Sequence, residues 1–197
     1  MKILLKLLSI VSIPFIIGLS LPESDSSPAA DVITTENPDH LDGTFTGGFG
    51  EQTCRSCHFD YDLNMDGGTL SVEGLQNTYQ SGKSYEITVK LQAEQLEIGG
   101  FQLTSRFEDG NQAGDFSWDG KHLMFTPSIS DEVKYLQHSA EGTEPTSENE
   151  IYWTFTWTAP EENDEKVILN IAANSGNYDD SSFGDWIYAK ELTLRPE

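Results

Sequence analysis

Cysteine is almost absent from this 197-residue chain, in which Cys54 and Cys57 are the only two. A structural zinc site takes four Cys or His ligands, and no second cysteine pair is present to complete one. A Cys-x-x-Cys pair can also be a thioredoxin-like redox motif, but that motif belongs to a βαβ context, which this chain lacks. The pair therefore requires another explanation.

Basic residues are also scarce, with 11 Lys and Arg against 33 Asp and Glu and a net charge of −22. A surface this negative argues against nucleic acid and against anionic lipid headgroups as partners. It would attract cationic partners, including basic electron-transfer proteins and divalent metal ions. It would equally keep an exported protein soluble.

The N-terminus predicts export. A short basic start over residues 1–6 precedes an apolar run over 7–21, which together indicate a signal peptide at residues 1–21. The run is only marginally long for a membrane anchor, so we expect membrane contact only through an uncleaved leader. Residues 22–40 are rich in Ser, Pro, Asp, Glu and Asn, which is typical of a flexible linker. The predicted location is the periplasm, the extracellular space or the cell surface.

His58 directly follows Cys57, and Cys-x-x-Cys-His is the attachment pattern of c-type haem. Two thiols at this spacing can each add to one vinyl group on a haem edge, and His58 can then bind iron as the proximal ligand. The sequence predicts covalent haem c at Cys54 and Cys57, in an attachment segment over residues 41–70. The alternative is a Cys54–Cys57 disulfide, with His58 in its place by coincidence.

The attachment segment is glycine-rich, has no helical periodicity and contains few apolar residues. A haem is a large and mostly apolar plate, so exposing one face to water forfeits about 25 cal/mol per Å² of burial. We therefore expect the later part of the chain, or a partner, to cover that face.

An acidic stretch after the motif matches the calcium loop of EF-hands. Asp62, Asn64 and Asp66 precede Gly67, and Glu73 stands at the twelfth position of the loop. A turn and a strand follow instead of a helix, so the alternative is an acidic loop that only forms a turn.

From Val72 onward the apolar residues recur with a period of two. The predicted strands lie at 85–91, 101–107, 151–157, 167–173 and 186–194, with shorter candidates at 122–125 and 133–138. Short alternating strands joined by Gly, Asp, Asn, Pro and Ser predict an all-β fold, an immunoglobulin-like antiparallel sandwich over residues 71–195.

Several stretches resemble known proteins. Residues 100–104 (GFQLT), 114–116 (GDF) and 155–160 (FTWTAP) resemble the reeler domain, the sandwich named from reelin. Residues 46–51 (TGGFGE), 135–139 (YLQHS), 172–174 (AAN) and 184–186 (GDW) are similar to exported bacterial proteins of the choice-of-anchor V type. In that family a glycine-rich Cys-x-x-Cys-His segment precedes a reeler-like sandwich, so the resemblance implies this architecture for residues 42–194.

A bound haem would need a second axial ligand for low-spin electron transfer, whereas an open position would allow small-ligand binding. His138 is the preferred candidate, because it ends a predicted strand in a stretch that resembles the family. Met124 and His122 come next. The alternative for any of these histidines is a surface or capping role.

We therefore expect an exported monohaem c-type cytochrome that transfers electrons to a redox partner, for which a basic protein is the candidate. The alternative function is a haem-free extracellular adhesion or matrix module with a Cys54–Cys57 disulfide and bound calcium. We expect no enzyme, because no nucleophile–base arrangement or G-x-S-x-G turn is present.

Overall fold

The computed structural model describes residues 43–127, 132–161 and 165–197, all of which fall within one compact unit. The predicted signal peptide and linker lie outside the described residues. Within those residues, no helix has the length and apolar character needed to cross a membrane.

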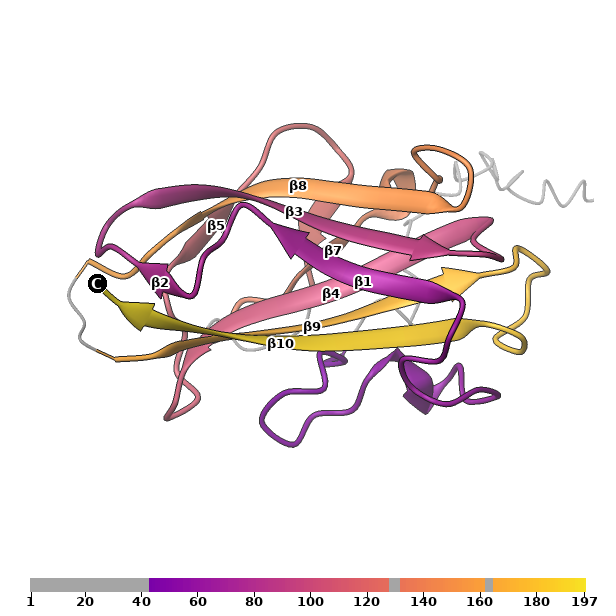
Figure 1. The fold of residues 1–197 in the computed structure, drawn as a ribbon, viewed down its shortest axis with the longest axis horizontal. Helices are drawn as coiled ribbons and strands as arrows, with labels where there is room; N and C mark the ends of the chain where they lie inside the picture. Colours follow the sequence, from indigo (N-terminus) through magenta and orange to yellow (C-terminus); the bar gives the residue numbers. More distant parts are fainter. Residues whose placement is uncertain (1–42, 128–131, 162–164) are drawn as a thin grey trace, which may run out of the picture. The chain divides into compact units, whose positions relative to one another are not determined.

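The described residues form an all-β sandwich of two sheets (Figure 1). The elements, in chain order, are η2 (Cys54–Ser56), β1 (Gly68–Glu73), β2 (Thr78–Tyr79), β3 (Ser84–Ala93), β4 (Ile98–Phe107), β5 (Asp115–Ser117), β6 (Leu123–Phe125), β7 (Leu136–His138), η3 (Ala140–Gly142), β8 (Glu150–Thr158), β9 (Val167–Gly176) and β10 (Trp186–Pro196). One sheet has the order β1-β3-β8-β5 and the other β2-β10-β9-β4-β7-β6. The strand pairs are antiparallel, apart from the short parallel pair of β2 with β10.

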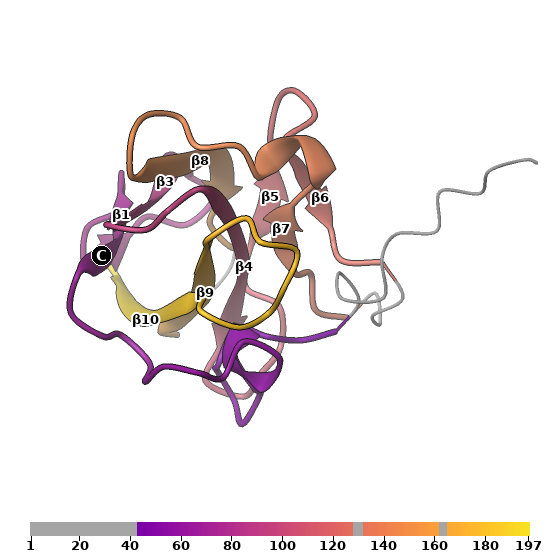
Figure 2. The ribbon, with the colours of Figure 1, turned by 90° about the vertical axis from the view of Figure 1, so that its right-hand side faces the viewer.

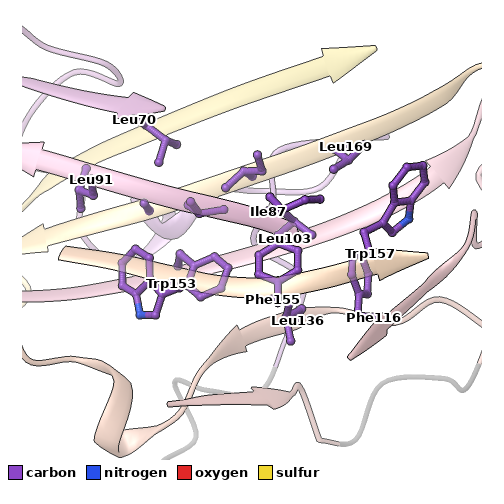
Figure 3. Close-up of a cluster of buried hydrophobic side chains, with 14 of the residues drawn as sticks. Leu70, Ile87, Leu91, Leu103, Phe116, Leu136, Trp153, Phe155, Trp157 and Leu169 are labelled. Atoms are coloured by element: carbon purple, nitrogen blue, oxygen red, sulfur yellow. The ribbon is translucent and has the colours of Figure 1, made fainter. Parts of the chain in front are cut away.

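Strand β8 shows why the sequence folds in this way. Its alternate residues Ile151, Trp153, Phe155 and Trp157 are buried between the sheets, and Figure 3 shows the aromatic members within the cluster of buried side chains. The two indole N–H groups are satisfied by backbone carbonyls, that of Trp153 by Gly142 at 2.7 Å and that of Trp157 by Ala113 at 3.0 Å. The predicted alternation in this strand is confirmed.

Strands β4 and β9 depart from this pattern because they are buried on both faces. Phe101 and Leu103 of β4 enter the core, while Gln102 and Arg106, on the opposite face, are buried as well. Successive side chains of a strand point to opposite faces, so another part of the chain must cover the outer face. The cover is the segment that precedes β1, which runs below β9 and β10 in Figure 1.

Candidate functional site

Residues 43–53, which we call the strap, lie across the outer face of β4 and β9. The strap doubles back on itself through a bridge between Thr46 and Thr53, and the Gly47 amide donates to the Gln52 carbonyl at 2.9 Å. Gly48 is seated directly on β9: a Cβ at this position would come within 2.0 Å of the Asn170 side chain. Only glycine allows so close an approach.

Two side chains of β4, Gln102 and Arg106, fasten the strap, and Tyr135 adds a further hydrogen bond. The Gln102 side chain accepts from the Phe45 amide at 2.6 Å and donates to the Gly43 carbonyl at 2.9 Å. Nη1 of Arg106 donates to Glu51 at 2.6 Å, and the Tyr135 hydroxyl donates to the same carboxylate. Burial, followed by the contact with Glu51, raises the pKa of Tyr135, so its hydroxyl remains a donor. The strap is thus held by hydrogen bonds to residues that the sheet orients.

The strap is followed by η2, a single tight turn that begins at Cys54 and is capped at its end by Cys57. Thr53 caps this turn by accepting from the Arg55 amide at 3.2 Å. The amides of Cys57 and His58 both donate to the Cys54 carbonyl, at 3.2 and 3.1 Å. The local sequence therefore brings both thiols and the imidazole into one turn.

Cys54 and Cys57 are both free thiols, so the disulfide of the alternative interpretation is not formed. Burial raises the pKa of the Cys54 thiol to about 12. Reactive and redox-active cysteines have lowered thiol pKa values, so Cys54 has the opposite character.

His58 contacts a buried carboxylate from the C-terminal part of the chain. Its Nδ1 lies 2.6 Å from Oδ2 of Asp185, whose residue surface is only 3% exposed. The other carboxylate oxygen accepts from the Asn177 amide at 3.2 Å. The side-chain nitrogen of Asn174 lies 3.4 Å from Nδ1 of His58. Histidines that bind a metal through one ring nitrogen usually donate a hydrogen bond from the other ring nitrogen to a carboxylate or a carbonyl, and His58 has such a carboxylate partner.

A cavity of about 760 Å³ opens beside the motif. Its lining comes from η2, the start of β4, the end of β7, and β9 with the loop that follows it. The lining residues are Phe45, Cys54, Ser56, Cys57, His58, Ile98, Gly99, Gly100, Phe101, Gln102, Gln137, His138, Thr143, Asn174, Gly176, Tyr178, Asp179, Asp180, Ser181, Ser182 and Asp185. Its volume lies in the range of small-molecule and cofactor sites, roughly 300–1,000 Å³. In Figure 2 the loop after β9 (yellow) lies near the turn of the attachment segment (purple).

His138 lines this cavity together with both cysteines and His58. Its Nδ1 lies 3.1 Å from both the amide nitrogen and the carbonyl oxygen of Phe101. Its ring packs so closely on the strand that a Cβ at Gly100 would come within 2.7 Å of it. The other two candidates, His122 and Met124, are outside the lining, and the His122 ring contacts the Glu141 carbonyl instead. Iron ligation by His138 stays a prediction.

The residues at the cavity suit a covalently attached haem. Two thiols and two imidazoles share one cavity with the apolar side chains of Phe45 and Ile98. Asn174 contributes a buried carbonyl oxygen that has no hydrogen-bond partner among the described residues. These donor types are the ones that a covalently attached haem requires, and apolar surface is available for the plate.

The predicted calcium residues are not gathered into a site. Asp62 lies 3.5 Å from Arg55, the side chain of Asn64 accepts from the Ala189 amide, and Glu73 ends β1. Over residues 43–127, 132–161 and 165–197, no three His, Cys, Asp or Glu side chains form a group that could hold a metal ion. Calcium binding by Asp62, Asn64, Asp66 and Glu73 stays a prediction without a preformed site.

Sequence reasoning missed Asp185, Asn174 and Gln102 as parts of the site. The first two stand in stretches whose resemblance to the choice-of-anchor V proteins gave them no role. The available signal was a polar residue at an outward position of an otherwise apolar strand, as at Asn174 and Gln102.

Comparisons with known proteins address the sandwich. No protein-family model matches the chain, and no curated protein sequence matches it. Among solved structures, a human F-spondin reeler domain is 21% identical with a TM-score of 0.45, covering 68% of this chain and 93% of that one. The Reelin-N domain of F-spondin is 22% identical with a TM-score of 0.46, covering 72% and 96%. A cohesin module of a Clostridium perfringens family 33 glycoside hydrolase is 15% identical with a TM-score of 0.41, covering 68% and 100%. These likenesses concern the fold alone, so function is inferred from the residues at the cavity.

Proposed function

We propose that this protein is an exported c-type cytochrome that carries one haem on Cys54 and Cys57 and transfers electrons. The observation that carries the proposal is the shared cavity, which His58 and His138 both line although His58 follows η2 and His138 ends β7, far later in the chain. When bound, haem iron supplies the one-electron redox chemistry.

Each residue at the cavity has a role in this proposal. Cys54 and Cys57 hold the group by thioethers, His58 is the proximal ligand, and His138 is the candidate distal ligand. Phe45 and Ile98 offer apolar surface that keeps water from the site and so contributes to the reduction potential. If His138 does not bind iron, the open position makes the protein a binder of small ligands instead.

The surface beside the motif suits a basic redox partner. Phe59 directly follows His58, is 55% exposed and contacts the equally exposed Phe183 edge-to-face with ring centroids 5.6 Å apart. Asp179 and Asp180 add negative charge at the cavity. Exposed aromatic side chains are typical of interface centres, and a rim of one charge steers a partner of the opposite charge.

The test is expression with its leader in a host that attaches haem c in the periplasm, followed by intact mass and absorption spectra. We expect mature protein heavier by one haem, with a Soret band, and a Cys54→Ser/Cys57→Ser double variant with neither. Folded, colourless protein of unmodified mass from the same host contradicts the proposal.

A haem-free adhesion or matrix module is the second candidate. The observation that favours it is the completeness of the core: buried side chains of the two sheets form a continuous cluster that includes neither the motif nor His138. The sandwich body therefore needs no cofactor to close its core. The mass and spectral test separates the two candidates.

A further inference from the structure

We propose that Asp185 is a positioning residue that fixes the tautomer of His58, so that Nδ1 carries the proton and Nε2 is the nitrogen left to bind iron. The expected effect on the reduction potential rests on the proposed function. The effect on the His58 tautomer does not, because it concerns the polypeptide alone.

The hydrogen-bonding partners of Asp185 determine the tautomer. An ionised carboxylate only accepts, so the 2.6 Å contact between Nδ1 of His58 and Oδ2 of Asp185 requires a proton on Nδ1. The other oxygen accepts from the Asn177 backbone amide at 3.2 Å, and Oδ2 also accepts from the side-chain nitrogen of Asn174 at 3.4 Å. The carboxylate is held at the base of β10, buried from water, where a charge-assisted hydrogen bond is strong.

The same contact should affect the iron. A carboxylate that accepts from the far nitrogen of a ligating histidine raises the basicity of the bound nitrogen. A more basic ligand favours the ferric over the ferrous state, so Asp185 should lower the reduction potential.

The substitution Asp185→Asn tests both steps. Asparagine has one oxygen, and if that oxygen keeps the bond from the Asn177 amide, the NH₂ group faces Nδ1 of His58. A donor at that place requires an unprotonated Nδ1, so the ring should change to the Nε2–H tautomer. The matched control is Asp180→Asn, which removes one charge from the same cavity at a residue without a contact to His58. Residue 180 has a positive φ of 59°, a conformation that asparagine tolerates well.

The first measurement is the His58 tautomer in haem-free protein, by proton–nitrogen NMR correlation of the imidazole. We expect Nδ1–H in the unsubstituted chain and in Asp180→Asn, and Nε2–H in Asp185→Asn. The second is the potential of haem-loaded protein: a tenfold change in the relative stability of the two iron states corresponds to about 59 mV for a one-electron couple. We expect a rise of about that size for Asp185→Asn and a clearly smaller one for Asp180→Asn.

An unchanged tautomer in Asp185→Asn, or a potential no higher than that of Asp180→Asn, overturns the proposal. If Asp185→Asn does not fold, Asp185→Glu, which keeps the charge, takes its place with Nδ1–H as the expected tautomer. A chain that never acquires haem overturns the proposed function, and the NMR measurement still decides the role of Asp185.

Discussion

Glu51 of the strap accepts a hydrogen bond from Nη1 of Arg106 on β4 at 2.6 Å, and the two side chains are only 11% and 5% exposed. The Arg106 guanidinium also lies 4.2 Å from the centroid of the Phe49 ring, which covers it. A buried ion pair stabilises little relative to an apolar pair, but removing one partner leaves an unpaired buried charge. This pair therefore keeps the strap, and with it the motif, on the sheet.

We predict that Glu51→Ala lowers the free energy of unfolding by about 3 kcal/mol, because Arg106 then remains charged and buried. The matched control is Glu108→Ala, which breaks the Lys166–Glu108 pair, whose side chains are 44% and 57% exposed. The control should cost less than about 1 kcal/mol. Urea denaturation of the three proteins measures the difference, and equal losses would show that Glu51 does not anchor the strap.

The distal ligand can be tested spectroscopically. In haem-loaded protein, His138→Ala should convert a six-coordinate low-spin spectrum to a five-coordinate or mixed-spin one, because it removes the second imidazole from the cavity. His122→Ala is the matched control, since His122 directly precedes β6, the strand that pairs with β7, and does not line the cavity. A spectrum that His138→Ala leaves unchanged removes this residue from the iron site.

The sandwich was predictable because β8 and β3 each bury one face, so that apolar residues recur at every second position of these strands. Strands β4 and β9 bury both faces, and their outward positions are filled by polar residues such as Gln102. Gln102 is buried by a strap residue 57 positions earlier in the chain, and the strap lies still farther from β9; no pattern within a single strand reveals such a contact.

The candidate site likewise has a part that the local sequence predicts and a part that depends on the fold. Cys54, Cys57 and His58 form one local turn, so their spacing alone predicts their chemistry. Asp185 meets His58 only because the loop after β9 returns to the motif, and that contact depends on the completed fold. Resemblance to a family drew attention to the stretch that contains Asp185 without giving it a role.

Partner binding should depend on the exposed aromatic pair beside the motif. With a purified basic c-type cytochrome as the probe, Phe183→Ser should slow electron exchange roughly fivefold, as loss of an interface anchor does. Tyr152→Ser is the matched control, because Tyr152 is 45% exposed on β8 in the opposite sheet. Stopped-flow rates at low and high salt measure the effect; equal slowing by both variants would place the contact elsewhere.

The Cys54 thiol gives the haem-free protein a distinctive response to pH. Its pKa is raised from 9.0 to about 12 because burial disfavours the thiolate. A raised pKa contributes stability that is fully present below pH 9 and is lost as the pH rises towards 12, since only the unfolded chain ionises there. Comparison with Cys54→Ser isolates this contribution, because Tyr135 titrates equally in both proteins. The unfolding free energy of the unsubstituted chain should fall more steeply above pH 9.

The raised thiol pKa should slow the alkylation of Cys54. At pH 8 a thiol with a pKa near 12 is thiolate about one part in 10⁴, against roughly a quarter for an ordinary cysteine. Iodoacetamide should therefore modify Cys54 at least about 100-fold more slowly in the folded protein than in urea, as peptide mass mapping would measure. Thioether formation removes the ionisable thiol, so haem-loaded protein should show neither the alkylation nor the extra loss of stability. Rapid alkylation of Cys54 in folded, haem-free protein would mean that its thiol pKa is not raised.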